Sequence, residues 1–145
     1  MIENDQYLEA KVMTATPHQL HLMIIEAAIR FASQAEAALE AQDFETTHLA
    51  LNSARSFVAE AISGLNEEAA PELVDRLKGL FAFVYRRLVD ADLKNDLTLI
   101  GDALRILRTH RETWLALGEQ LRTSDSTGVA SADVDDNGQS RSWTG

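Results

Sequence analysis

The 145-residue chain has no cysteine, and only 2 prolines interrupt it. The lack of cysteine excludes disulfides, thiolate-bound zinc or iron–sulfur centres, and a thiol nucleophile. Long apolar runs are missing too, because the longest aliphatic block covers only residues 22–25. The first residues include Glu3 and Asp5, whereas a secretory signal opens with positive charge. We therefore expect neither an export signal nor a transmembrane helix.

Positive charge is also scarce. Lys and Arg number 13 against 23 Asp and Glu, which gives a net charge of −10. Such a chain repels phosphate backbones and anionic lipid head groups, so we expect no nucleic-acid partner and no membrane insertion. With 46% apolar and 25% charged residues, the length suits one compact domain with its own core.

Both ends of the chain differ from its body. Residues 123–145 hold no leucine or isoleucine and are rich in Ser, Thr and Asp, which predicts a disordered acidic tail. Trp143 is the one side chain there that could anchor a partner. Residues 1–15 carry too few apolar side chains for a stable helix alone. We expect this N-terminal segment either to dock on the bundle or to stay loose.

The body, residues 16–122, has apolar residues at helical spacing almost throughout. Thr16 and Gln19 form a capping-box pattern around a first-turn proline, which predicts a helix start. Further starts are predicted at Asp43, Pro71 and Asp96. Four helices joined by short loops pack as antiparallel neighbours. The predicted fold is therefore all-α, an antiparallel up-down four-helix bundle.

Two of these helices carry more apolar surface than a bundle needs. In the first, we expect the core line to include Leu20, Met23, Ile24 and Phe31. A second, displaced line consists of Leu22, Ile25 and Ile29, and the third helix adds Val74, Phe83 and Tyr85. Either a tilted bundle or the N-terminal segment covers these side chains, or they form a groove for another chain. We also expect Gly79, Gly101 and Gly118 to mark close helix approaches.

Catalytic and metal-binding patterns are weak. A di-iron bundle needs two Glu-x-x-His motifs, and this chain has only one, at Glu45 and His48. His18 and His21 share a helix face, but no third ligand is placed by sequence, and we assign them capping and surface roles. His110 is the one candidate for a histidine phosphotransfer bundle. We expect no enzyme, metal or cofactor, and we keep two alternatives, phosphotransfer on His110 and a self-associating structural bundle.

In order and at matching distances, several segments resemble the FliS family of flagellin export chaperones. These are Tyr7, the run Thr-Ala-Thr-Pro-His-Gln-Leu at residues 14–20, and residues 22–31, 80–92 and 107–114. The chain departs from the family pattern at Asp92, where an asparagine is usual, and at Phe81 and Phe83, which replace tyrosines.

The resemblance implies a cytoplasmic chaperone that binds the disordered C-terminal segment of flagellin, prevents its premature polymerisation and assists its delivery to the export apparatus. An export apparatus component, an anti-sigma factor or a co-chaperone are further implied partners. The resemblance implies that Tyr7, with Val12 and Met13 beside it, influences client binding. From the surplus apolar lines we expect the groove residues Leu22, Ile25, Ile29, Phe83 and Tyr85. We expect Arg86 and Arg87 at the rim, and the N-terminal segment in the groove when no client is bound.

Overall fold

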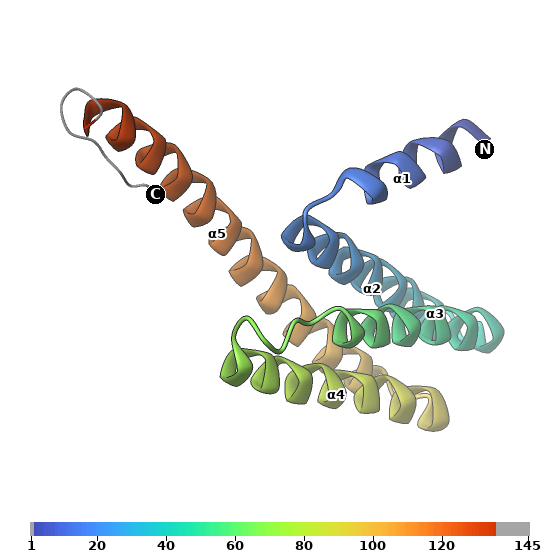
Figure 1. Cartoon of the computed structure of the whole chain (residues 1–145). Coiled ribbons are helices and arrows are strands. Elements are labelled where there is room, and N and C mark those ends of the chain that lie inside the picture. Colours follow the sequence, from blue (N-terminus) through green and yellow to red (C-terminus); the bar gives the residue numbers. More distant parts are fainter. Residues whose placement is uncertain (1, 136–145) are drawn as a thin grey trace. The chain divides into compact units, whose positions relative to one another are not determined.

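The computed structural model describes the backbone of residues 2–135 and the side chains of residues 6–11 and 13–124. That backbone is helical and contains no strand, which confirms the predicted all-α fold (Figure 1). The helices are α1 (Ile2–Thr14), α2 (Pro17–Glu40), α3 (Phe44–Ser63), α4 (Pro71–Lys94) and α5 (Leu97–Asp135). The chain divides into two units, Met1–Arg111 and Glu112–Gly145. The packing described below is that of the first unit.

Local chemistry sets the helix starts, as the sequence predicted. The Gln19 backbone N–H donates to Thr16 Oγ1 at 3.1 Å, and the Thr16 N–H donates to Gln19 Oε1 at 3.0 Å. This reciprocal box opens α2, with Pro17 in its first turn. At the start of α3, Asp43 Oδ1 accepts from the Thr46 N–H at 3.2 Å. Hydrogen bonds from Thr46 also lower the pKa of the Asp43 carboxyl.

The helix ends follow the same logic. Gly64 closes α3, and its N–H donates to the Glu60 carbonyl at 3.1 Å. Asn95 closes α4 in the left-handed region at φ 50°, which an asparagine tolerates better than most residues. Directly after it, Asp96 Oδ1 accepts from the Thr98 N–H at 2.9 Å. The left-handed conformation of Asn95 and the side-chain hydrogen bond of Asp96 therefore shape the short loop between α4 and α5.

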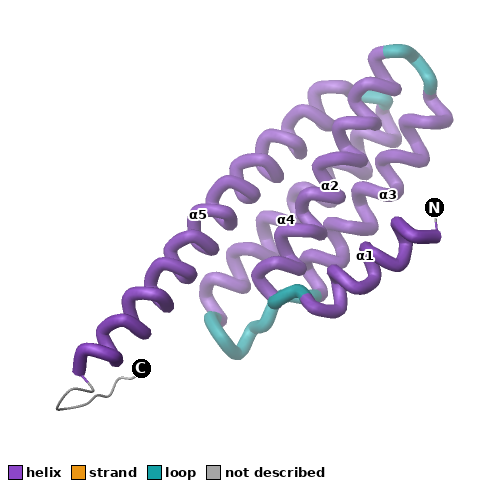
Figure 2. Tube along the Cα trace, turned by 90° about the horizontal axis from the view of Figure 1, so that it is seen from above, coloured by secondary structure: helices purple, strands orange, loops and turns teal. Residues whose placement is uncertain are grey.

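Helices α2, α3, α4 and the first part of α5 form the bundle, which Figure 2 shows side by side. Helix α2 packs on α3, and α3 packs on α4 in turn. Toward α5, the Arg111 Nε lies 3.0 Å from Glu26 Oε2, and Arg108 Nη2 lies 3.1 Å from Ser33 Oγ. The largest fully buried side chains are Phe81, Ile25, Leu51, Leu88, Ile100, Leu104 and Leu107.

Small side chains at the helix contacts are alanines, not glycines. Buried alanines line α2 at positions 28, 32 and 35 and α3 at positions 50, 54 and 61. A Cβ added at Gly79 or Gly101 would meet nothing within 4 Å. The expectation that these two glycines mark close helix approaches is therefore wrong. Alanine gives the same close approach without the helix-destabilising backbone freedom of glycine.

At the two ends of the chain, the helices extend further than expected. Residues 2–14 form α1, but Tyr7, Leu8 and Met13 on it are exposed. Helix α5 continues to Asp135, so it overlaps the expected disordered tail over residues 123–135. No proline stops the helix there. Residues 136–145, and with them Trp143, lie outside the described residues, and disorder of the tail stays a prediction.

Candidate functional site

The two apolar lines of α2 are placed differently from the expectation. Ile25 is 0% exposed at the centre of the core, which corrects its placement on a displaced surface line. The core line runs through positions 21, 25, 28, 32, 35 and 39. Leu20, Met23, Ile24 and Phe31, which we expected in the core, are only partly buried. Periodicity marked both lines as apolar, but only the neighbouring helices decide which one faces inward.

Leu22 and Ile29 remain candidates for contact with another chain. Both are partly buried, and their seven-residue spacing puts them on one side of α2. That side is the one from which Glu26 reaches Arg111 of α5. The structure thus keeps two of the three residues of the displaced line together on one flank.

Helix α4 exposes both predicted aromatic residues. Phe83 and Tyr85 are each 36% exposed, whereas Val74, expected beside them, is buried and Leu73 is exposed. Because residues two apart on a helix do not face each other, Phe83 and Tyr85 lie on different sides of α4. The structure therefore does not bring them into one groove. The Arg87 guanidinium lies over the Phe83 ring, 4.7 Å from its centroid.

A pair of buried histidines joins α2 to α5. His21 Nε2 and His110 Nε2 lie 2.9 Å apart, and the two residues are 8% and 7% exposed. The Phe81 ring of α4 packs against both, edge-on to His110 with centroids 4.9 Å apart. Burial lowers the pKa of His21 to about 4, with smaller contributions from His110 and His18, and burial lowers the pKa of His110 as well.

This pair corrects two expectations. A phosphotransfer histidine has to be exposed, whereas His110 is buried with its Nε2 facing His21, so the phosphotransfer alternative is wrong. His21 has a core position and not the surface role expected from its polarity. No group of three potential metal ligands occurs among the described side chains. The sequence carried no signal for this pair, because its two members are 89 residues apart.

In the isolated Glu45-x-x-His48 pattern, His48 has a structural role. His48 Nδ1 lies 2.7 Å from Asp92 Oδ2, and Arg55 Nη1 lies 3.1 Å from the same oxygen. Asp92 belongs to α4, and the other two residues belong to α3. One carboxylate thus accepts two hydrogen bonds across the contact between these helices.

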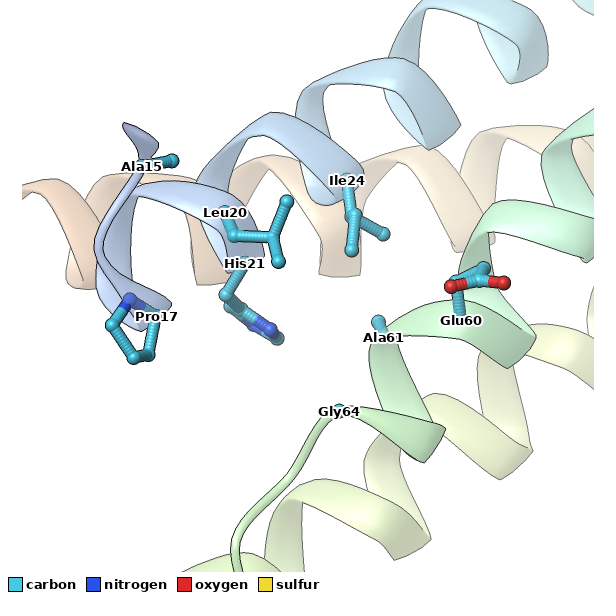
Figure 3. A pocket seen from close by; sticks show the side chains of 8 residues that line it. All are labelled: Ala15, Pro17, Leu20, His21, Ile24, Glu60, Ala61 and Gly64. Carbon is cyan, nitrogen blue, oxygen red and sulfur yellow. The ribbon is translucent and has the colours of Figure 1, made fainter. Parts of the chain in front are cut away.

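A cavity of about 200 Å³ opens where α2 begins and α3 ends. Its apolar wall consists of Ala15, Pro17, Leu20, Ile24, Ala61 and Gly64. Figure 3 shows Leu20, His21 and Ile24 on α2 directed toward the space in front of Ala61 and Gly64 on α3. His21 and Glu60 are its polar lining residues. No sequence pattern indicates this cavity, because the space lies where Ala61 and Gly64 have little or no side chain.

A second hollow, of about 330 Å³, lies at the start of α4. It is lined by Glu67, Pro71, Glu72 and Asp75. Glu67, in the loop before α4, pairs with Lys78 on α4, and this ion pair lowers the pKa of the Glu67 carboxyl. In the described part of the chain, no helix has the length and apolar character needed to cross a membrane.

Comparison with known proteins gives a consistent result. The model of the family described as flagellar protein FliS matches residues 2–121. The flagellar secretion chaperone FliS of Bacillus subtilis is 31% identical over 108 residues, 74% of this chain and 80% of that protein. Its counterpart from Salmonella typhimurium is 29% identical over 120 residues, 82% of this chain and 89% of that protein. The flagellar secretion chaperone FliSB of Pseudomonas aeruginosa is 25% identical over 107 residues, covering 74% and 85%.

Proposed function

Because this chain belongs to the FliS family of flagellar proteins, we propose that it binds the C-terminal segment of flagellin in the cytoplasm before export. Holding that segment prevents premature polymerisation and presents flagellin to the export apparatus. The family identifies the chain as a flagellar export chaperone. We propose flagellin as the client, and we propose the surfaces that bind it.

One observation carries the proposal: large apolar side chains are exposed on α1, α3, α4 and the first part of α5. They are Tyr7, Leu8, Met13, Phe44, Leu49, Leu73, Phe83, Tyr85, Leu93 and Leu97. Such side chains suit a partner that presents its own apolar face, as an amphipathic helix does. Ordering a long client costs conformational entropy, and an extended apolar contact offsets that cost.

The arrangement of these residues supports a client that wraps around the bundle. Leu22 and Ile29 lie on one flank of α2, whereas Phe83 and Tyr85 lie on different sides of α4. A single short helix cannot reach all four side chains at once. A disordered segment can contact them in turn, because it adapts its path as it folds on the surface. Ile25, in the core, supports the fold and takes no part in this contact.

The N-terminal helix α1 supplies a further client-binding surface in this proposal. Tyr7 is 66% exposed and Met13 is 80% exposed, so both are accessible to a partner. Val12 belongs to the same proposed surface, and its side chain lies outside the described residues. We expect α1 to cover client-binding surface without flagellin and to move aside when flagellin binds. Equal rates of proteolysis near Tyr7 with and without saturating flagellin would contradict this exchange.

Calorimetric titration with the C-terminal segment of flagellin from the same genome tests the function. We expect saturable one-to-one binding with a negative heat-capacity change. Phe83→Ala and Tyr85→Ala should each weaken binding, whereas Asp75→Ala, a change at an exposed polar position on the same helix, should not. Absence of binding by the folded wild-type protein would overturn the proposal. An export apparatus component, an anti-sigma factor or a co-chaperone as additional partners stays a prediction.

A further inference from the structure

The cavity between the start of α2 and the end of α3 has the form of a side-chain pocket. Its volume, about 200 Å³, exceeds that of several water molecules at about 30 Å³ each. Leu20 and Ile24 form one wall, and Ala61 and Gly64 form the other (Figure 3). Gly64 has φ −83°, so glycine is not required there by its backbone conformation. A Cβ at this position would touch only the Glu60 carbonyl, at 3.6 Å. The space is therefore open to a visiting apolar group.

The polar groups of the cavity give it a negative charge. His21 is neutral at pH 7, because burial lowers its pKa to about 4. Glu60 is exposed and contributes a carboxylate. Among the described side chains, Lys, Arg and His form ion pairs with Glu26, Glu67 and Asp92, but none pairs with Glu60. An apolar pocket thus lies beside a carboxylate that no cation of the bundle neutralises.

We infer that this cavity binds one apolar side chain of the flagellin C-terminal segment, with a lysine or arginine of the same segment pairing with Glu60. The inference rests on the proposed function and adds the chemistry by which one part of the client is recognised. An apolar residue and a cation three or four positions apart lie on one face of a helix and match this arrangement. Charge complementarity of this kind improves selectivity against acidic amphipathic segments.

Titration of the full-length protein with the synthetic flagellin C-terminal segment tests the inference. Glu60→Lys should raise Kd by about tenfold or more, because it places like charges together. Glu60→Gln should give a smaller increase in Kd. Added salt should reduce the difference in Kd between this variant and wild type. Glu40→Lys is the matched control, since Glu40 is also an exposed, unpaired carboxylate in the last turn of its helix. It lies at the other end of α2 and should change Kd by less than about twofold.

A second variant fills the space directly. Gly64→Leu should weaken flagellin binding while helicity and the melting temperature stay at wild-type values, because the backbone accepts a side chain there. Reversing single cations of the flagellin segment to glutamate should restore binding to Glu60→Lys for one of those changes. That charge swap would identify the pairing residue of the client.

The outcomes separate the two proposals. If wild type binds and both Glu60→Lys and Gly64→Leu bind equally well, the cavity inference is wrong and the proposed function stands. If folded wild type does not bind the segment, both are wrong. If Glu60→Lys changes the mass seen by light scattering and leaves flagellin binding intact, the cavity belongs to a contact between copies. If deletion of residues 2–13 abolishes the effect of Glu60→Lys, its occupant is α1, which also overturns the inference.

Discussion

The Nε2 atoms of His21 on α2 and His110 on α5 lie 2.9 Å apart and form one hydrogen bond between the two rings. At such a distance one ring donates and the other accepts, so the arrangement requires a neutral acceptor ring. Phe81 packs against both rings, which links α4 to the same contact. The pair therefore connects three helices of the bundle through groups that gain charge in mild acid.

The first prediction concerns stability against pH. The pKa of His21 is lowered from 6.5 to about 4 in the folded state, so between these values the unfolded chain binds more protons. Stability is then full above about pH 6.5 and is lost as the pH falls toward about 4. The loss from His21 is on the order of 3 kcal/mol. Urea unfolding across this range should show it, and the double variant His21→Gln, His110→Gln should have a flatter profile.

Charged groups around the pair could add their own pH dependence. They are His18 on α2, Glu60 on α3 across the cavity, and the ion pair between Glu26 and Arg111. The residual slope of the double variant measures their contribution. A double variant whose profile is as steep as that of wild type would contradict the assignment to the histidines.

The second prediction follows from the corrected position of Ile25. A fully buried isoleucine in a close-packed core leaves a cavity when it is shortened, so Ile25→Ala should cost about 2–5 kcal/mol. Leu22→Ala, at a partly buried position on the flank of the same helix, should cost clearly less. Urea unfolding compares the two. Equal losses, or a greater loss for Leu22→Ala, would contradict the placement of the core line.

The starts of α2 and α3 and the end of α4 could be predicted from the sequence because they depend on neighbouring residues. Thr16 and Asp43 accept hydrogen bonds from backbone groups three residues away, and Asn95 adopts its left-handed conformation locally. The inward face of a helix depends instead on residues distant in sequence. His21 is in the core because His110 and Phe81 meet it there. For the same reason, no sequence pattern indicates the cavity, which lies beside the small residues Ala61 and Gly64.

The third prediction concerns Asp92, which accepts hydrogen bonds from His48 and Arg55 across the contact of α3 and α4. Arg55 and Asp92 have side chains only 14% and 15% exposed, so removing the carboxylate leaves a mostly buried guanidinium unpaired. Asp92→Ala should cost about 1–3 kcal/mol. The matched change Asp102→Ala removes an ion pair with the exposed Arg105 and should have little effect. Equal unfolding midpoints for the two variants would contradict a role for Asp92 in helix packing.

The fourth prediction addresses residues 123–135. This part of α5 is rich in Ser, Thr and Asp, which have weak helix propensity. We expect its amides to exchange with solvent much faster than those of residues 97–111, which include the buried Ile100, Leu104 and Leu107. Hydrogen exchange followed by mass spectrometry resolves the two ranges. Comparable protection in both would show a stable helix and contradict the predicted disorder of the tail.

The fifth prediction concerns Gly79, which lies in the middle of α4 with open space where a Cβ would be. Gly79→Ala should stabilise the protein by about 1 kcal/mol, because alanine loses less backbone entropy in a helix and meets no obstacle. Urea unfolding measures the gain, and destabilisation would contradict the open surroundings. The flagellin titration of the same variant tests a second point. Gly79 precedes the exposed Phe83 by one helical turn, so a more stable variant that binds flagellin less tightly would indicate that the client approaches the α4 backbone there.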